Sequence, residues 1–457
     1  MKQNRPNNSK PKNQRQEQGQ GKAGLVARKV AAKLLGSVLD EKKNLDALID
    51  PQHGDHAYLG LIDKDRALIR AILMICLRRK GQIDDALRQV LDRKTPKNAT
   101  HLTHSLSVAA AQILFLDVPD SAAVNLAVTS IAEDRRTMRF SNLANAVLRR
   151  LSREKEEILK GQDIGRLSMP PWFFKRLRKS FGKTRASKIA EILSDEAALD
   201  VSVKSDPEGW AKKFSGITLP NGTVRLKPHG PIPEMEGYDE GEWWIQDAAA
   251  SLPAKLLGNI SGLKTADLCA APGGKTAQLA IAGAQVTSVE ISASRQERLQ
   301  ANLSRLKLTA DIVIADILEW QPEQLFDAVL LDAPCSSTGT VRRHPDILWT
   351  KSAEDITALA SLQFQLWNKA IELVKPGGII VFSNCSLDRE EGEDLYAKIL
   401  KARDDIEAFP IETDEVPGLN DAITRQGTLR TLPIYYPNQE TRLAGLDGFF
   451  AARLRRL

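Results

Sequence analysis

The feature that most constrains the fold is the run over residues 265–279, TADLCAAPGGKTAQL, where an apolar segment passes through small residues into a helical segment. A strand, turn and helix of this kind presents backbone N–H groups and a positive dipole end to a nucleotide-like ligand. Gly273 and Gly274 let the backbone approach that ligand because they lack a Cβ. A P-loop requires a glycine where Cys269 stands, and the dinucleotide spacing G-x-G-x-x-G is missing. The run therefore predicts a Rossmann-like site for another nucleotide-like ligand.

Four later apolar runs each end in a carboxylate or a cysteine. They are 286–291 with Glu290, 312–316 with Asp316, 326–335 with Asp332 and Cys335, and 378–386 with Cys385. Continuous β-branched runs separated by helical stretches such as 295–307 are typical of buried parallel strands. In such sheets the ligand lies beyond the carboxyl ends of the strands. We therefore expect these side chains to converge on one crevice.

The residues at these strand ends predict chemistry. A carboxylate after the second strand suits the two hydroxyls of a ribose, which fits Glu290, and Asp316 is expected to face an adenine edge or an amino group. Cys335 and Cys385 would lie across the same pocket, where a thiolate is a strong nucleophile. Taken singly, each cysteine is also compatible with a buried small apolar residue. The four cysteines show no C-x-x-C pairing, so no metal site is expected.

Several segments together resemble the NOL/NOP/Sun family of RNA 5-methylcytosine methyltransferases. The resemblance rests on CAAPGGKT at 269–276, DAPCSSTG at 332–339, RHPD at 343–346, NCS at 384–386, and the flanking pairs QD at 246–247 and DGFF at 447–450. It implies a Rossmann-like class I methyltransferase domain over 245–457, with S-adenosylmethionine as cofactor. The chain departs from the family at Asn384, where a threonine is usual, and at Arg389, where a proline is frequent. Asn384 can still donate and accept hydrogen bonds near the thiol.

The resemblance also implies roles for individual residues. Cys385 is the expected nucleophile at C6 of a cytosine, Asp332 contacts the base, and Cys335 helps remove the C5 proton so that the methylated base is released. Addition at C6 is needed because C5 alone is too weak a nucleophile to accept the methyl group. The expected cofactor residues are Cys269, Ala270, Ala271, Pro272, Gly273, Gly274, Lys275, Glu290, Arg295, Asp316 and Asp332. For Arg295, a solvated position on a helix face is an equal alternative.

The first half of the chain reads differently. Residues 1–24 hold six Lys or Arg and one Glu, almost no apolar residues, and are expected to form a disordered basic tail. Residues 25–156 show only helical periods, with Leu143, Val147 and Leu151 spaced as one apolar face. The segment FSNLANAVLRR at 140–150 is similar to the closing element of the NusB family, which implies an all-helical domain that docks on RNA. A stabilising bundle without its own ligand is the alternative.

Residues 162–244 are expected to form a small α+β connector that binds RNA. PPWFFKRLRK at 170–179 combines aromatic with basic residues, which suits base stacking and phosphate neutralisation, although ordinary helix packing explains it equally well. His344, beside Arg342 and Arg343, either meets substrate in the same way or caps a loop.

Composition completes the expectation. No apolar run reaches the roughly 18 residues of a membrane span, no secretory leader is recognisable, and the cysteines form no disulfide framework. These features predict a cytoplasmic, monomeric, multidomain protein, and the two resemblances imply an enzyme that methylates cytosine C5 in small-subunit (16S) ribosomal RNA. Its expected parts are an all-α NusB-like domain, a small α+β connector and an α/β methyltransferase domain. The alternatives are a transfer RNA cytosine-5 methyltransferase and a non-catalytic RNA-binding or ribosome-assembly factor.

Overall fold

The computed structural model describes residues 12–92, 95–96, 99–227 and 230–457, in two compact units, Met1–Pro170 and Pro171–Leu457. Helix α1 spans Lys12–Leu39, so its first turns lie within the tail that was expected to be disordered. Residues 1–11 of that tail lie outside the described residues.

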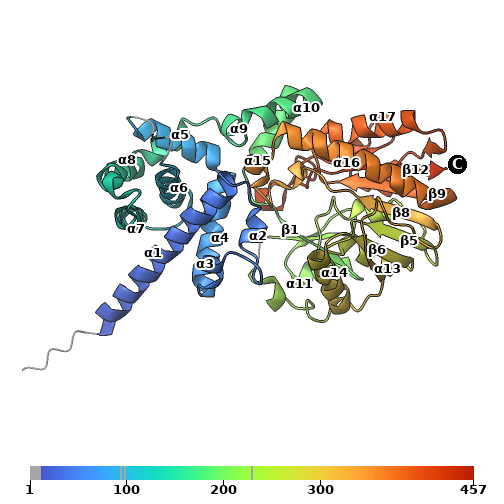
Figure 1. Cartoon of the computed structure of the whole chain (residues 1–457), viewed down its shortest axis with the longest axis horizontal. Helices are drawn as coiled ribbons and strands as arrows, with labels where there is room; N and C mark the ends of the chain where they lie inside the picture. The colour runs from blue at the N-terminus through green and yellow to red at the C-terminus, as the bar shows by residue number, and fades with distance from the viewer. Residues whose placement is uncertain (1–11, 93–94, 97–98, 228–229) are drawn as a thin grey trace, which may run out of the picture. The chain divides into compact units, whose positions relative to one another are not determined.

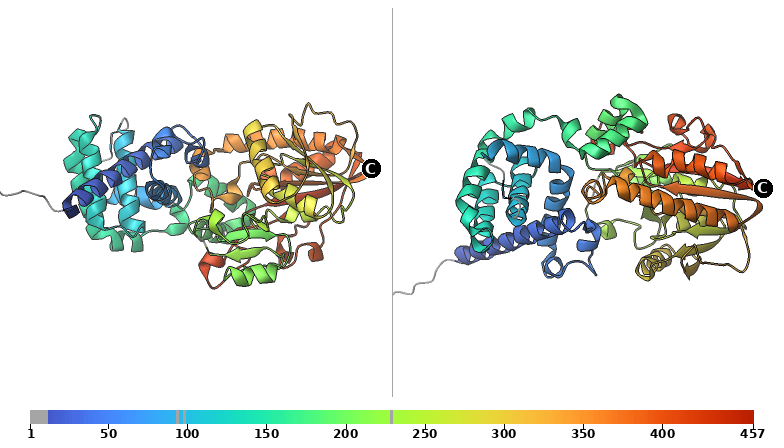
Figure 2. Two further views of the ribbon diagram at one scale, coloured as in Figure 1. Left: turned by 90° about the horizontal axis from the view of Figure 1, so that it is seen from below. Right: turned by 45° about the horizontal axis from the view of Figure 1, so that its top comes forward.

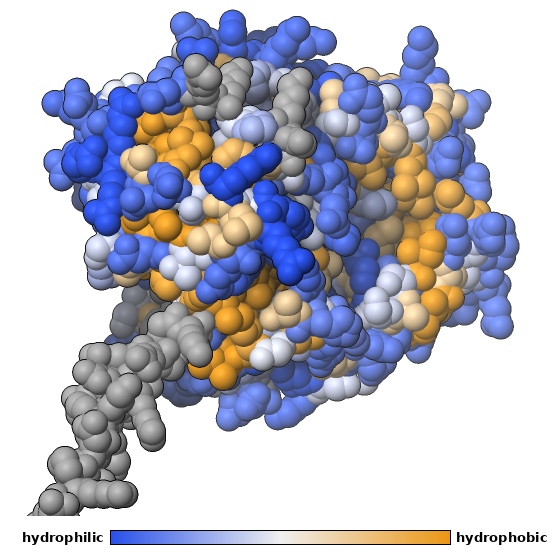
Figure 3. Space-filling view, turned by 60° about the vertical axis from the view of Figure 1, so that its left-hand side comes forward, coloured by the Kyte–Doolittle hydropathy of each residue, from blue (hydrophilic) through white to orange (hydrophobic). Residues whose placement is uncertain are grey.

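The first unit is entirely helical in its described part (Figure 1). Its remaining elements are α2 Leu45–Leu48, α3 His56–Leu59, α4 Asp63–Arg78, α5 Lys80–Val90, α6 Thr100–Phe115, α7 Asp120–Glu133, the 3-10 turn η1 Met138–Phe140, α8 Ser141–Lys160 and α9 Ile164–Leu167. Val147 and Leu151 of α8 are buried as the helical spacing predicted, but Leu143 is 42% exposed. Figure 3 shows apolar patches among hydrophilic residues on one face of this unit. Exposed apolar residues are ordinary on folded domains, and these by themselves assign no binding site.

The second unit begins with helix α10, Pro171–Ile192, and a small antiparallel sheet in the order β2-β3-β1-β4. The elements of this module are β1 Leu199–Val203, α11 Pro207–Lys213, β2 Ile217–Thr218, β3 Val224–Leu226, η2 Ile232–Glu234 and β4 Trp243–Ile245. Trp243 anchors its core, fully buried and packed edge-on against Phe214 with ring centroids 5.7 Å apart. The connector therefore has its own apolar core.

The large sheet runs in the order β10-β12-β9-β8-β5-β6-β7, with β11 paired to β12. The strands are β5 Lys264–Leu268, β6 Gln285–Glu290, β7 Asp311–Ile314, β8 Phe326–Asp332, β9 Val374–Asn384, β10 Ile406–Ala408, β11 Leu429–Arg430 and β12 Phe450–Arg456. Strands β5 to β9 pair in parallel, whereas β10, β11 and β12 pair antiparallel. The chain leaves β5 toward β6 on one side and returns as β8 on the other, which makes the β5/β8 boundary the topological switch point.

Helices cover both faces of this sheet, as the views in Figures 1 and 2 show. The helices in this part of the chain are α12 Leu252–Lys255, α13 Gly274–Ile281, α14 Ala293–Arg305, α15 Ile347–Thr350, α16 Ala353–Glu372 and α17 Glu393–Ala402. The short 3-10 turns are η3 Thr338–Thr340, η4 Arg389–Glu391, η5 Thr413–Glu415, η6 Asn420–Ala422 and η7 Thr441–Leu443. Successive residues of β8 alternate between the two cores: Leu330 packs on the α12 and α13 side and Leu331 on the α16 and α17 side. This alternation is the two-residue period of a strand buried on both faces.

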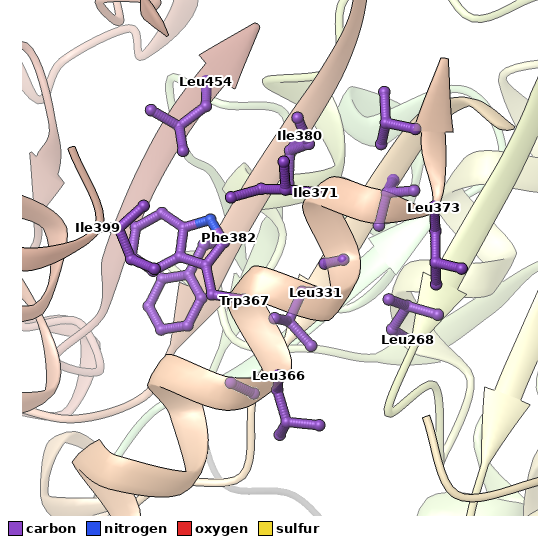
Figure 4. Packing of buried hydrophobic residues seen from close by; sticks show 14 of the residues in the cluster. Leu268, Leu331, Leu366, Trp367, Ile371, Leu373, Ile380, Phe382, Ile399 and Leu454 are labelled. Carbon is purple, nitrogen blue, oxygen red and sulfur yellow. The ribbon is translucent and has the colours of Figure 1, made fainter. Parts of the chain in front are cut away.

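Aromatic stacking fixes α16 on the strand that ends next to Cys385. The rings of Trp367 in α16 and Phe382 in β9 are stacked with centroids 4.1 Å apart, and both are fully buried (Figure 4). Ile399 of α17 and Leu454 of β12 belong to the same cluster. Tight packing of this kind restrains the carboxyl end of β9, because displacement of a large ring would open a cavity.

Candidate active site

The turn after β5 adopts the conformation that its small residues predicted. Cys269 and Gly273 have positive φ values of 62° and 102°, and Gly273 lies just before α13. A Cβ added at Gly273 would come within 2.5 Å of Leu299 Cδ1, so a glycine is required there. At Gly274 the nearest atoms to an added Cβ lie at 3.6 Å, so protein packing does not require a glycine at that position.

A buried hydrogen bond ties this turn to the strand before it. Thr276 Oγ1 donates to Asp267 Oδ2 at 2.6 Å, and both side chains are fully buried. Burial raises the pKa of Asp267 to about 7, although the hydrogen bond from Thr276 and the charge of Lys275 oppose the shift. The pairing of Asp267 with Thr276 was not identified from the sequence, because an apolar strand pattern does not indicate that one of its residues is a buried carboxylate.

A cavity of about 310 Å³ opens at the carboxyl ends of the parallel strands. Eight of the residues expected at the site line it: Cys269, Ala271, Glu290, Arg295, Asp316, Asp332, Cys335 and Cys385. The other expected residues, Ala270, Pro272, Gly273, Gly274 and Lys275, belong to the turn but do not line the cavity. The cavity wall also includes apolar side chains that sequence reasoning missed, among them Ile291, Ile317, Leu362 and Leu366. The convergence predicted from strand ends is therefore present.

Glu290 has a buried carboxylate oxygen that is suited to accept a hydrogen bond from a ligand. Its side chain is 1% exposed, and its Oε2 atom is buried with no hydrogen-bond partner in the described part of the chain. Its Oε1 atom accepts from the Ser292 N–H at 3.1 Å. An unpaired buried carboxylate oxygen is costly unless a donor arrives, so it fits a ligand hydroxyl such as those of a ribose. Arg295 lies 3.6 Å from Glu290 Oε1 and donates to the Ala271 carbonyl at 3.1 Å, which helps to shape this wall.

Asp332 is held from two sides at the end of β8. Lys275 Nζ donates to its Oδ2 at 2.8 Å, and Ser383 Oγ donates to its Oδ1 at 2.8 Å. The Lys275 ammonium also lies 5.1 Å from the centroid of the Phe449 ring. Lys275 therefore acts in this structure by orienting Asp332.

The two expected catalytic cysteines are in direct contact. Cys335 Sγ and Cys385 Sγ are 3.4 Å apart, and both side chains are half-buried at the cavity wall. The hydrogen bond with Cys385, together with burial, raises the pKa of Cys335 well above its ordinary value. Cys335 therefore keeps its proton and shares it with the neighbouring sulfur. Cys269 is also half-buried at the cavity wall, and burial raises its pKa, which makes it a poor nucleophile.

A buried carboxylate that the sequence analysis did not identify joins the two cysteine loops. Glu391 accepts from the Ser336 N–H at 2.8 Å, from the Ser386 hydroxyl at 2.6 Å and from Gln363 Nε2 at 2.9 Å. The Ser336 hydroxyl also donates to it. Burial raises the pKa of Glu391 even though these hydrogen bonds oppose the shift. Because Ser336 follows Cys335 and Ser386 follows Cys385, Glu391 sets the separation of the two thiols.

Asn384 makes hydrogen bonds to the backbone of the same loop rather than to the Cys385 thiol. Its Nδ2 donates to the Glu391 carbonyl at 2.6 Å, and its Oδ1 accepts from the Ser386 N–H at 3.1 Å. The expectation that Asn384 supplies hydrogen bonds near the sulfur is therefore replaced by a role in shaping the backbone around Cys385.

Arg342 and Arg343 are structural in this fold. Arg343 donates to Asp247 Oδ2 at 2.6 Å and to Asp447 Oδ2 at 3.1 Å, which joins the two pairs noted as flanking elements in the sequence. Arg342 is 2% exposed and donates to the carbonyls of Glu196 and Ala444. Both guanidinium groups are therefore engaged within the fold, although Arg343 is 22% exposed, and the expectation that His344 meets substrate stays a prediction.

The described residues offer neither a metal cluster nor a membrane span. No group of three or more His, Cys, Asp or Glu residues in that part of the chain is arranged to hold a metal ion. Among the helices described, none combines the length and the apolar character required to cross a membrane.

Comparison with known proteins identifies the relatives of both units. Residues 257–455 match the family model "16S rRNA methyltransferase RsmB/F", and residues 25–153 match the NusB family. Ribosomal RNA small subunit methyltransferase B of Cronobacter sakazakii is 30% identical, over 88% of this chain and 96% of its own length. The protein of the same name from Xanthomonas campestris pv. campestris is 33% identical, over 85% of this chain and 91% of its own.

A solved structure shows the same fold. The crystal structure of PH0851 covers 94% of this chain and 99% of its own, with a TM-score of 0.69 and 21% sequence identity. An all-α NusB domain followed by a Rossmann-like methyltransferase domain is therefore the architecture of this chain, as the sequence predicted.

Proposed function

Because the chain belongs to the RsmB/F family of 16S ribosomal RNA methyltransferases, we propose that it methylates C5 of a cytosine in small-subunit ribosomal RNA. S-adenosylmethionine supplies the methyl group. The observation that carries the proposal is the contact of two thiols, 3.4 Å apart, beside the unpaired Glu290 oxygen in one cavity. One thiol is needed to add to the base and another to release it.

The cofactor pocket has the donors and acceptors that the nucleoside part of S-adenosylmethionine requires. The free Glu290 oxygen suits a ribose hydroxyl, and Asp316, which follows β7 at the cavity edge, suits the adenine amino group. The Gly273 turn brings the backbone close to the same ligand. These residues would place the methionine end toward Asp332 and the cysteines.

The cysteines act in sequence. Cys385 Sγ forms a bond to C6 of the cytosine, which makes C5 electron-rich enough to accept the methyl group. Asp332, oriented by Lys275 and Ser383, hydrogen-bonds the base and stabilises the adduct. Cys335 gives up its own proton to solvent, and the thiolate so formed removes the C5 proton. The electron pair of that C–H bond forms the C5–C6 double bond, and the C6–S bond breaks to free Cys385 as a thiolate.

The contact between the two sulfurs supports an order for these steps. While Cys385 has a free sulfur, its hydrogen bond is the largest cause of the raised pKa of Cys335. Once the Cys385 sulfur is bonded to C6 it is an uncharged thioether and only a weak acceptor, so its effect on the pKa of Cys335 weakens and that pKa falls. Cys335 therefore becomes a base only after the adduct has formed.

The test is a denaturing gel of protein incubated with 16S ribosomal RNA and S-adenosylmethionine, comparing wild type with Cys335→Ala and Cys385→Ala. We expect a covalent protein–RNA band with Cys335→Ala and none with Cys385→Ala. Equal methyl transfer to transfer RNA would favour the transfer RNA alternative. An absence of both methyl transfer and adducts in all three proteins, with RNA binding retained, would favour a non-catalytic assembly factor.

A further inference from the structure

One face of helix α10 exposes a row of cations that no acidic residue of the helix before Glu191 neutralises. Its exposed cations are Lys175, Arg178, Lys179, Lys183, Arg185 and Lys188, and we call them the α10 basic face. No Asp or Glu occurs in α10 before Glu191, and none of the six cations forms an ion pair with another described residue. Their charges are thus available to an external anion.

The helical period separates these cations from the packed side of α10. Phe173 and Leu177 are buried, and 3.6 residues per turn place Lys175, Arg178 and Lys179 away from that buried side. Gly182, with φ 78°, kinks the helix, and its second segment again buries apolar residues while its cations remain exposed.

One further cation of α10 is tied to the loop that carries the nucleophile. Arg176 donates to both carboxylate oxygens of Asp388, at 2.5 and 2.8 Å, and to Glu390 at 2.7 Å. The Asp388 side chain is 5% exposed, and its N–H donates to Ser386 Oγ, next to Cys385, at 3.0 Å. These carboxylates raise the pKa of Arg176. A ligand held on α10 is therefore held beside the loop of Cys385.

We propose that the α10 basic face docks the phosphate backbone of the RNA substrate next to the nucleophile loop. This inference rests on the proposed function and adds the surface that holds the RNA. Phosphates match a row of unpaired Lys and Arg, and binding there releases counterions. A lipid surface fits less well, because the exposed positions between Lys175 and Lys188 include no apolar side chain to insert.

The test compares four proteins that all keep the active-site residues. The first is wild type, the second is K175Q/R178Q/K179Q, and the third, K175R/R178K/K179R, keeps the charge at the same positions. The fourth, K212Q/K307Q/K401Q, removes three other exposed lysines of the same unit. Affinity for a 16S ribosomal RNA transcript is measured at several salt concentrations, from about 50 to about 200 mM, alongside S-adenosylmethionine affinity and methyl-transfer kinetics.

For K175Q/R178Q/K179Q we expect the slope of log affinity against log salt to fall in magnitude by about 2 to 3, and RNA affinity to fall roughly tenfold or more. KM for RNA rises, whereas kcat at saturating RNA and cofactor affinity stay within about twofold of wild type. The charge-keeping variant and K212Q/K307Q/K401Q behave as wild type.

Two results would overturn the docking surface while leaving the proposed function intact. One is methyl transfer by wild type with an unchanged salt slope in K175Q/R178Q/K179Q. The other is loss of binding to anionic lipid vesicles by that variant with RNA affinity unchanged. Failure of the proposed function looks different: wild type transfers no methyl group to RNA, whatever the salt slopes are.

Discussion

Cys335 Sγ and Cys385 Sγ are in contact at 3.4 Å, although fifty residues separate them in the chain. The contact exists because β8 and β9 are parallel neighbours whose register pairs Asp332 with Ser383, so that the two loops leave the sheet side by side. Because the two thiols are in contact, they can share one proton.

Replacement of Cys385 is expected to lower the pKa of Cys335. In Cys385→Ala the largest cause of the raised pKa is gone, while burial remains, so the new pKa lies between the wild-type value and the ordinary thiol value. The rate of iodoacetamide alkylation at Cys335, followed by mass spectrometry as a function of pH, measures it. Cys385→Ser, which keeps an acceptor, is the control. An unchanged pH profile in Cys385→Ala would show that the two sulfurs do not share a proton.

Glu391→Gln is expected to slow catalysis without loss of the fold. The substituted side chain can still accept at its one oxygen, but its amide group then faces the Ser336 and Ser386 hydroxyls, so the spacing of the cysteine loops changes. We expect kcat to fall about tenfold to a hundredfold, as when positioning of reacting groups is disturbed, while S-adenosylmethionine affinity and KM for RNA stay near wild type.

The matched control is Glu407→Gln on β10, an exposed residue paired with Arg455. Its activity and its stability should both equal those of wild type. If Glu391→Gln turned over RNA at the wild-type rate, the proposed positioning role would be wrong.

Asp267 makes stability depend on pH. Its folded-state pKa of about 7 is raised above the ordinary 3.8, so the folded state binds an extra proton between these values. Its contribution is therefore fully present below about pH 4 and is lost as pH rises to about 7, by up to ~4 kcal/mol. Asp267→Asn removes this dependence, so its free energy of unfolding relative to wild type should rise between about pH 5 and about pH 8.

Urea denaturation at several pH values measures this difference. Asp327→Asn serves as the control: Lys375 lowers the pKa of Asp327, so the contribution of Asp327 is lost only in more acidic solution and its difference from wild type stays flat between about pH 5 and about pH 8. A difference between Asp267→Asn and wild type that stays constant with pH would contradict the raised pKa.

Gly273→Ala is expected to weaken cofactor binding as well as stability. Alanine at φ 102° is strained, and its Cβ would also clash with Leu299 Cδ1 at 2.5 Å. Gly377 separates the two effects, because it too has a positive φ of 82° but no atom within 4 Å of an added Cβ. Gly377→Ala should lose about 1–2 kcal/mol of stability with normal S-adenosylmethionine affinity by calorimetry. Equal cofactor affinity in both variants would show that the turn tolerates the displacement.

The strands and their terminal residues were predictable from local pattern. Glu290 and Asp332 end β6 and β8, as expected from the apolar runs 286–291 and 326–335. Continuous apolar runs have few alternatives to a buried parallel strand. The antiparallel strands β10 and β12 at the sheet edge were not predicted, because strand direction depends on long-range pairing that no local period records.

Residue types and short-range spacing were enough to predict the family, the order of the domains and the groups at the site. How those groups work together depends on the folded chain. The tertiary structure placed Glu391 between two loops, directed the Asn384 hydrogen bonds to the loop backbone and paired Arg343 with both Asp247 and Asp447. Such partners are distant in the chain, and which polar group a buried carboxylate meets is set by packing of the whole sheet rather than by any local pattern.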